Sequence, residues 1–397
     1  MQKTRSLIQL HLWFPNLFEF KGGIQVYLKD LLRAIDTDFS NVYSVVFDKL
    51  DKTKPPDKFN SEKFSFRFSG SVPRVWQTPH FVFKLTIGAL INRPRLILCG
   101  HLNFSPVAFW IHRLTYIPYW ILVYGVDAWD VQNKWQTKAL HAAEKIVSIS
   151  GYTRDRLIQE QNLPPDNFSL LPVTFDASRF KIGPKPDYLL KRYGLQPQQP
   201  VILTVTRLSS ADGYKGYDQI IQALPEIHRQ IPNLHYVITG KGDDRSRVEQ
   251  LITQLNLQEC ITLTGFIPDN ELNDHYNLCD VFAMPSKGEG FGIVYLEALA
   301  CGKPTLGGNQ DGAIDALSHG ELGVLVNPDD VDAIALTLTQ MLQRIYPHPI
   351  LYQPQALRQK VIEKFGFERF QQTLADLLRN ANLGVDEHES VTCHPLP

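Results

Sequence analysis

KGEGFGIVYLEALACGKP, residues 287–304, joins the end of an apolar strand to a helix that must be largely buried. MPS (284–286) ends the strand, KGEGFG turns sharply, and IVYLEALAC (293–301) starts the helix. Glu289 stands between glycines, which let the turn approach a ligand closely. Glu297 follows about two helical turns later among apolar neighbours, where a carboxylate needs hydrogen-bond donors. Sugar or ribose hydroxyls would supply them; the alternatives are a helix-start acid at Glu289 and an exposed helix position at Glu297.

A second loop, VTRLSSADGYKGYDQII (205–221), places cations between a predicted strand and a predicted helix. Arg207 ends the strand and Lys215 precedes the helix, so a guanidinium and an ammonium can converge on a diphosphate. The alternative is a solvated surface loop, the usual location of Lys and Arg. Nearer the N-terminus, Gly22 and Gly23 precede a helical pattern and can present backbone N–H groups to a phosphate, although a plain tight turn has the same spacing.

Strand and helix patterns alternate along both halves of the chain, which predicts an α/β fold with parallel sheets. A chain of 397 residues exceeds one ordinary domain, and the segment 181–200, rich in proline and polar residues, is the predicted link between two doubly wound halves. Ligands are then expected at the strand C-termini that face a cleft. The expected strands are 6–15, 42–47, 64–68, 95–100, 119–125, 145–150, 201–207, 234–240, 261–266 and 280–286.

Composition excludes several classes of protein. Forty basic and 41 acidic residues give a net charge of -1, so no global field recruits nucleic acid. Five scattered cysteines, with no signal peptide before Leu7, predict a reducing cytoplasm. The apolar region 104–126 is interrupted by His112 and Arg113, so no transmembrane segment is expected. Aromatics and cations interleave over 63–84, as in a membrane-surface segment, but FSFRF (64–68) alternates like a half-buried strand, and we favour that interpretation.

EGFGIVYLEALACGKP resembles the signature of glycosyltransferase family 4, whose members are retaining GT-B enzymes that use nucleotide-sugar donors. Four further segments resemble motifs of this family and follow one another in the same order along the chain. They are GG at 22–23, Arg207-Leu followed by Lys215-Gly, TGKGDD (239–244) and TGFIPDNEL (264–272). ISGYTRDRL (149–157) and LPVTFDASRF (171–180) resemble segments that close the N-terminal half of such enzymes. The resemblance therefore covers nearly everything except the C-terminal tail.

The resemblance implies a GT-B fold, in which two Rossmann-like domains face a central cleft. The acceptor-binding domain would span 1–180 and the nucleotide-sugar-binding domain 181–364. A C-terminal helix at 365–383 would pack back on the first domain, and disorder is predicted for the tail at 384–397.

The resemblance also assigns roles to single residues. Glu289 would bind donor-sugar hydroxyls, Glu297 the ribose, Arg207 and Lys215 the diphosphate, and Gly23 the phosphate from the opposite lobe. The backbone near Phe266 and Ile267 would face the base, and Phe291 and Gly292 would shape the sugar pocket. The donor-binding residues implied in this way are Gly22, Gly23, Arg207, Lys215, Gly240, Phe266, Ile267, Glu289, Gly290, Phe291, Gly292, Ile293 and Glu297.

One departure from the family pattern lies in VYGVDAW (123–129). Tyr124 stands where family members often have a histidine beside the reacting sugar, while Gly125 and Asp127 are retained. A tyrosine is a poor base near neutral pH, because its reference pKa is about 10. His101 is a candidate acceptor-site residue, with a structural hydrogen bond as the alternative. The candidate catalytic residues are Glu289, Arg207, Lys215, Tyr124, Asp127 and His101.

The predicted function is retaining hexosyl transfer from a nucleoside-diphosphate sugar to a hydroxyl of a glycan, glycolipid or small glycoside. No cofactor is expected, and the lack of a D-x-D motif predicts metal independence. The expected location is cytoplasmic, with at most peripheral contact at the inner face of a membrane. The alternative, favoured by Tyr124, is a non-catalytic nucleotide-sugar-binding subunit of a glycan-assembly system. The E-x7-E spacing argues against a nucleotide-sugar epimerase, and the absence of G-x-G-x-x-G at 22–23 against a dinucleotide oxidoreductase.

Overall fold

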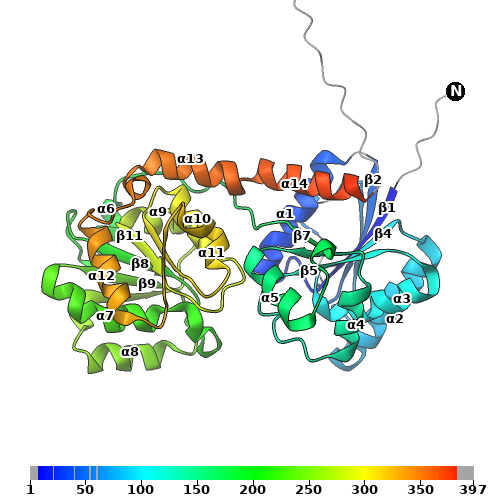
Figure 1. Cartoon of the computed structure of the whole chain (residues 1–397), viewed down its shortest axis with the longest axis horizontal. Coiled ribbons are helices and arrows are strands. Elements are labelled where there is room, and N and C mark those ends of the chain that lie inside the picture. The colour runs from blue at the N-terminus through cyan, green and yellow to red at the C-terminus, as the bar shows by residue number, and fades with distance from the viewer. Residues whose placement is uncertain (1–7, 21, 40, 53–54, 60, 382–397) are drawn as a thin grey trace, which may run out of the picture.

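The computed structural model describes residues 8–20, 22–39, 41–52, 55–59 and 61–381, which form two lobes lying side by side (Figure 1). Each lobe is built on one parallel sheet with helices on both faces, so the predicted α/β fold with two doubly wound halves is confirmed. The predicted tail at 384–397 lies outside the described residues.

In the first lobe, the described residues form a seven-stranded sheet in the order β3-β2-β1-β4-β5-β6-β7. Its central strands β4 and β5 are wholly buried because helices cover both faces of the sheet. The strands are β1 (Ile8–Phe14), β2 (Val42–Asp48), β3 (Phe64–Phe68), β4 (Leu96–Cys99), β5 (Tyr119–Val123), β6 (Lys145–Ser148) and β7 (Phe168–Leu170). The helices are α1 (Gly23–Asp38), α2 (Arg74–Asn92), α3 (Ser105–Thr115), α4 (Lys134–Ala142) and α5 (Gly151–Gln161).

In the second lobe, six strands of the described chain pair in the order β10-β9-β8-β11-β12-β13. The strands are β8 (Val201–Val205), β9 (His235–Thr239), β10 (Ile261–Gly265), β11 (Val281–Met284), β12 (Thr305–Gly308) and β13 (Val324–Val326). The helices are α6 (Asp187–Tyr193), α7 (Tyr217–Gln230), α8 (Arg245–Gln254), α9 (Asp269–Leu278), α10 (Ile293–Ala300), α11 (Ala313–Ala316) and α12 (Val331–Leu342).

Every strand expected from the sequence is present, and β7, β12 and β13 are additional. The strands β7 and β13 have three residues each, and two of the four residues of β12 are glycines, so none of them shows a clear apolar pattern. The strand order reverses between β1 and β4 in the first lobe and between β8 and β11 in the second. Ligands of doubly wound sheets bind at such reversals, beyond the strand C-termini. The loops after these four strands are therefore the places to look for a site.

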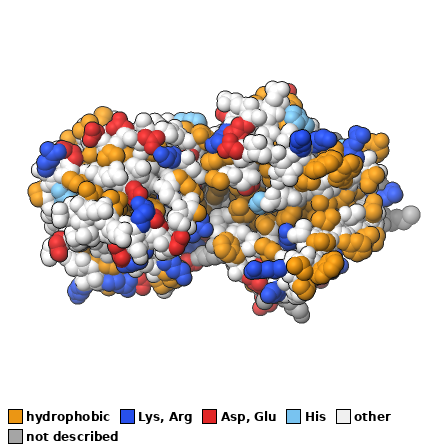
Figure 2. Space-filling model, turned by 90° about the horizontal axis from the view of Figure 1, so that it is seen from below, with side chains coloured by type: hydrophobic (Ala, Val, Ile, Leu, Met, Phe, Trp, Pro, Cys, Tyr) orange, Lys and Arg blue, Asp and Glu red, His pale blue; other side chains and the backbone are white. Residues whose placement is uncertain are grey.

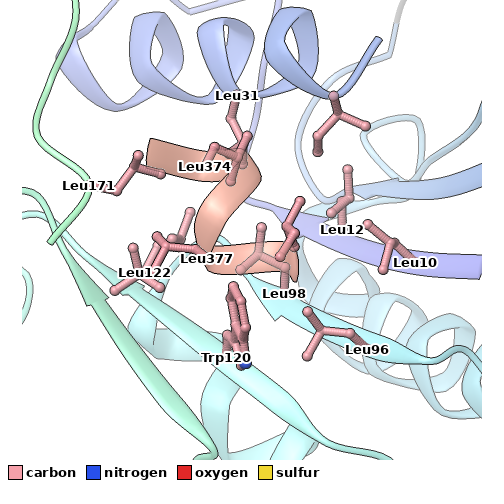
Figure 3. A pocket seen from close by; sticks show the side chains of 13 residues that line it. Leu10, Leu12, Leu31, Leu96, Leu98, Trp120, Leu122, Leu171, Leu374 and Leu377 are labelled. Carbon is pink, nitrogen blue, oxygen red and sulfur yellow. The ribbon is translucent and has the colours of Figure 1, made fainter. Parts of the chain in front are cut away.

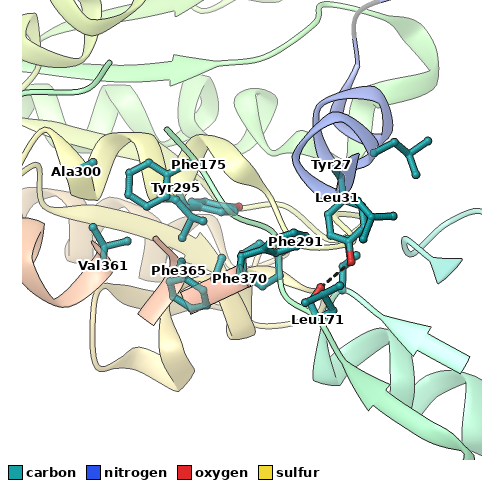
Figure 4. Packing of buried hydrophobic residues seen from close by; sticks show 14 of the residues in the cluster. Tyr27, Leu31, Leu171, Phe175, Phe291, Tyr295, Ala300, Val361, Phe365 and Phe370 are labelled. Carbon is teal, nitrogen blue, oxygen red and sulfur yellow. Dashed lines mark hydrogen bonds between the residues drawn. The ribbon is translucent and has the colours of Figure 1, made fainter. Parts of the chain in front are cut away.

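The chain returns from the second lobe to the first through α13 (Pro354–Phe365) and α14 (Phe367–Asn380), which lie along the top of both lobes in Figure 1. Arg358 of α13 donates to the carbonyl oxygens of Phe180, Ala300 and Ala177, which fastens the crossing to the segment between the lobes. Phe370 of α14 packs edge-on against Tyr27 of α1 (Figure 4). The predicted return of the C-terminal helix to the first domain is confirmed.

A small apolar cavity of about 20 Å³ remains beneath α14. Leucines of α14, α1 and the sheet line it together with Trp120, as Figure 3 shows for Leu374, Leu98 and Leu12. A gap of this size has room for about one water but offers it no hydrogen-bond partners, so it is a packing defect of the core.

No helix of the described residues is both long enough and apolar enough to cross a membrane. Exposed apolar side chains nevertheless gather over the first lobe on the face seen in Figure 2, whereas the second lobe shows fewer of them there.

Candidate functional site

The loop after β8 holds both predicted diphosphate-binding cations. Arg207 is 68% exposed, and its guanidinium lies 2.9 Å from the buried carboxylate of Asp212. Gly240, at the end of β9, has a φ of +129°, and a Cβ there would lie 1.7 Å from the carbonyl oxygen of Thr206. Only glycine allows this approach, and it fixes the backbone from which Arg207 projects.

Lys215 forms an ion pair with Glu289, which belongs to the loop after β11. Their side chains are 15% and 13% exposed, so the pair is largely shielded from water. Burial, aided by Arg207 and opposed by Asp212 and Asp311, lowers the pKa of Lys215 to about 8. With a carboxylate in contact, the ammonium stays charged at neutral pH. The ion pair thus joins the loops on the two sides of the strand-order reversal.

Asp311, which the sequence interpretation did not include, shapes the Glu289 turn. Its carboxylate accepts hydrogen bonds from the Ser286 hydroxyl and the Glu289 N–H, both at 2.7 Å, and from the Ala313 N–H at 2.9 Å. Burial raises the pKa of Asp311 to about 7, against these donors and Lys215. The sequence signal that could have identified Asp311 is GGNQDG (307–312), a glycine-rich turn that follows a short strand and contains a single acidic residue.

Glu297 lies on a buried face of α10, which excludes the exposed helix position considered above. It accepts a hydrogen bond of 2.7 Å from the hydroxyl of Tyr276 in α9. Burial and the neighbouring Glu297 raise the pKa of Tyr276 well above its ordinary value, so the phenol stays a donor. Tyr276 is a second residue missed from the sequence, because NDHYNL has an ordinary helical pattern.

The first lobe meets this cluster through backbone contacts at Gly290. A Cβ on Gly290 would lie 1.7 Å from the carbonyl oxygen of Tyr124, and one on Gly125 would lie 2.6 Å from the Gly290 Cα. Close by, the N–H of Tyr152 in α5 donates to Asp315 of α11 at 2.9 Å. The lobes are therefore closed against each other at the loops after β5 and β11.

Gly22 and Gly23 begin α1, whose Tyr27, one turn later, packs edge-on against Tyr124 at 5.5 Å. No protein atom of the described residues lies within 4 Å of where a Gly23 side chain would start. The preceding loop is held by the buried carboxylate of Asp51, which accepts the N–H groups of residues 17, 18 and 19. The N-terminus of α1 thus lies near Tyr124, where the two lobes meet, and there is open space beside Gly23.

Tyr124 directs its hydroxyl into the first lobe, where it donates to the carbonyl oxygen of Gly100 at 3.1 Å. Burial, together with Tyr27 and Asp127, raises the pKa of Tyr124 well above its ordinary value. The ring therefore remains neutral and cannot act as a base near neutral pH.

Asp127 accepts the N–H of Tyr124 at 2.9 Å and holds the turn after β5. Burial raises the pKa of Asp127 to about 7, against the N–H donors of the turn. His101 accepts the N–H of Asn103 through Nδ1 and caps a short 3-10 helix, Leu102–Phe104, while burial and Lys49 lower its pKa. Both side chains have structural contacts, and their catalytic roles stay predictions.

The remaining predicted donor contacts lie around the second sheet. Phe266 is 67% exposed after β10, and the Lys241 ammonium lies 5.4 Å from its ring centroid; Ile267 beside it is half-buried. The Phe291 side chain is buried and packs edge-on against Phe365 (Figure 4), which leaves only its backbone for a sugar pocket. Gly292, at a φ of +91°, caps α10, which begins at Ile293.

The structure thus brings together Arg207, Asp212, Lys215, Glu289 and Asp311 around the reversal of the second sheet. Tyr124 and Gly125 touch this cluster through Gly290, and Glu297 lies one turn below Ile293 on the adjoining helix. His101 follows Gly100 in the chain, and the Gly100 carbonyl oxygen accepts the hydrogen bond from the Tyr124 hydroxyl.

Solved structures with the two-lobed GT-B fold superpose on this chain. Anabaena Alr3699/HepE in complex with UDP superposes with a TM-score of 0.74 at 19% identity, over 94% of this chain and 100% of that chain. Sucrose-phosphate synthase from Thermosynechococcus elongatus superposes with a TM-score of 0.75 at 20% identity, over 95% and 99%. Residues 189–347 match the family model described as glycosyl transferases group 1. The sequence of the second lobe is therefore similar to that family, in agreement with the resemblance found in the sequence.

A GDP-mannose-dependent alpha-(1-6)-phosphatidylinositol monomannoside mannosyltransferase of Mycolicibacterium smegmatis is 36% identical over 210 residues, which are 50% of this chain and 53% of that protein. The protein of the same name from Mycobacterium tuberculosis is 32% identical over 242 residues, 59% of this chain and 61% of that protein. The chain thus spans little more than half the length of these curated relatives.

Tyr124→Phe is expected to leave turnover within about twofold of the wild-type value, because the Tyr124 hydroxyl already donates a hydrogen bond to the carbonyl oxygen of Gly100. Losing that buried hydrogen bond should lower the free energy of unfolding by about 1 kcal/mol. Nucleoside-diphosphate release and urea unfolding measure the two effects. A large loss of turnover without a loss of stability would show that the hydroxyl acts in the reaction.

Proposed function

We propose that this chain transfers a sugar from a nucleoside-diphosphate sugar to an acceptor hydroxyl, with retention at the anomeric carbon. The observation that carries the proposal is the shielded Lys215–Glu289 pair beside Arg207, at the strand-order reversal of the donor lobe and in contact with the first lobe. A diphosphate and a sugar need such cations and such an acid side by side.

The donor would separate the ion pair that exists in the free chain. Its diphosphate would take over Lys215 and recruit Arg207, whose exposed side chain is held at one point by Asp212. Glu289, released from Lys215, would accept hydrogen bonds from sugar hydroxyls, and Glu297 would do so for the ribose. Asp311 keeps the Glu289 backbone in place during this exchange.

In the transfer step, the bond between the anomeric carbon and the leaving phosphate oxygen breaks as the bond to the acceptor oxygen forms on the same face. The acceptor proton passes to the leaving phosphate oxygen, so the reaction needs no protein base. Lys215 and Arg207 stabilise the negative charge that grows on that oxygen. Lobe closure at Gly290 limits water access and hydrolysis of the donor. These charges come from side chains, which supports the proposal of a metal-independent enzyme.

We further propose a carbohydrate or glycolipid acceptor, with GDP-mannose as the first donor to test. The names of the mycobacterial relatives support this choice, since they describe GDP-mannose-dependent transfer to a phosphatidylinositol mannoside. The structural neighbour in complex with UDP makes UDP-sugars the second group.

The non-catalytic alternative depended on Tyr124 and is tested with the same donors. A thermal-shift series with GDP-mannose, UDP-glucose and ADP-glucose should show one donor class that stabilises the chain, by about 2.7 kcal/mol at a hundredfold excess over Kd. The same donor should release nucleoside diphosphate when acceptor is added. Binding without release for any acceptor would favour the non-catalytic subunit, and no stabilisation by any donor would overturn both readings.

A further inference from the structure

One side of the first lobe exposes a continuous apolar surface on α2. This helix buries Phe81, Leu85 and Ala89 in the core, four residues apart. Its opposite face is also apolar, with side chains at helical spacing that are 38% to 80% exposed: Val75, Trp76, Phe83, Ile87, Leu90 and Ile91. A helix that covers a soluble core normally has polar residues on that face.

The apolar surface continues over the two neighbouring helices. Trp110 and Leu114 of α3 are 50% and 73% exposed, and Tyr116 at the end of α3 is 83% exposed. Trp110 packs against Trp135 of α4 with the rings tilted and their centroids 5.2 Å apart, and α3 contacts α2. We call the outward face of α2, α3 and α4 the apolar face; it corresponds to orange areas over the first lobe in Figure 2.

The charges on this part of the chain have one sign. Residues 63–126 contain seven Lys or Arg and no Asp or Glu, in a protein whose net charge is -1. Arg74 begins α2, Arg93 and Arg95 follow its end, Arg113 lies on α3, and α4 adds Lys134 and Lys138. Arg74, Arg93, Arg95 and Arg113 are all exposed, so cations border the apolar face.

We propose that the apolar face docks the protein on an anionic phospholipid bilayer. Exposed Trp and Tyr side chains favour the boundary between headgroups and acyl chains, and the bordering cations attract anionic headgroups. The helices lie on the bilayer and do not cross it. We favour a bilayer over a protein partner because the charges of residues 63–126 all have one sign, which matches an extended anionic surface.

The test measures sedimentation of the full chain with phosphatidylcholine vesicles, either pure or containing about one third phosphatidylglycerol. No sugar donor or acceptor is present, so the outcome is independent of the proposed transfer reaction. The wild-type chain should bind the anionic vesicles and lose most of that binding in high salt or on pure phosphatidylcholine.

Two double variants and their matched controls locate the contact. Phe83→Ser with Ile91→Ser, and Arg93→Glu with Arg113→Glu, should each reduce the partition coefficient at least about tenfold. Leu336→Ser with Ile345→Ser, and Lys191→Glu with Lys360→Glu, change exposed side chains of the second lobe and of α13 and should leave the partition coefficient unchanged. Circular dichroism and thermal unfolding confirm that each variant is folded.

Three results would overturn the proposal. The first is a wild-type chain that does not bind anionic vesicles. The second is an equal loss of binding in the second-lobe controls. The third is a concentration-dependent dimer that the first-lobe variants dissociate, because the apolar face would then be an interface between two copies.

Discussion

Lys215→Ala is expected to lower kcat by two to three orders of magnitude, or about 3 to 4 kcal/mol, the cost typical of removing one charge-stabilising donor. Lys215 is the shielded cation of the site, and its partner Glu289 would have to leave it when the diphosphate arrives. Without the ammonium, the leaving phosphate loses a positive charge where water cannot replace it. Nucleoside-diphosphate release gives kcat, and calorimetry gives the donor Kd.

Lys287→Ala is the matched control for this change. Lys287 belongs to the same turn as Glu289, but it is 44% exposed and pairs with Asp329 at 2.5 Å. Its loss should alter kcat by less than about twofold, because an exposed pair contributes little. If Lys215→Ala kept wild-type kinetics, the assignment of the diphosphate site to this loop would be wrong.

Gly290→Ala is expected to hold the two lobes apart. The new methyl group would lie 1.7 Å from the carbonyl oxygen of Tyr124, and neither group can rotate away because both belong to the backbone. A shift of about 1 Å at a reacting centre can cost a hundredfold in rate, so turnover should fall at least that much. Small-angle scattering should show a larger radius of gyration for the variant in the absence of ligands.

Gly213→Ala is the control for the backbone change itself. Nothing lies within 4 Å of a Cβ at Gly213, so this variant should keep both its compactness and its turnover. Should Gly290→Ala also keep the wild-type scattering curve and rate, the contact between Gly290 and Tyr124 would not be needed for closure.

The local network explains why these two positions should be so sensitive. Asp311 holds Ser286, Glu289 and Ala313 through one carboxylate, and Asp212 holds Arg207. The Glu289 turn is therefore ordered before a ligand arrives, which reduces the entropy that binding must remove. The same rigidity prevents the turn from absorbing a methyl group at Gly290.

The amino-acid sequence by itself determined the two doubly wound halves and the turn that carries Glu289. Strands buried on both faces are continuous apolar runs, and glycines mark the turns after them, so both signals are local. The strands β7 and β13 were missed because three residues carry too little of that signal, and β12 because two of its four residues are glycines.

Only the tertiary structure decided how the site residues meet. Asp311, Tyr276 and Asp51 are ordinary in sequence, and their importance comes from backbone and side-chain partners 21 to 34 residues away. Tyr124 looked like a replacement at a reacting centre, but folding turned its hydroxyl toward Gly100. Periodicity records which face of an element is buried, whereas a hydrogen bond between distant segments depends on how complete elements pack. For that reason, the chemical groups of the site could be named from the sequence, and their partners could not.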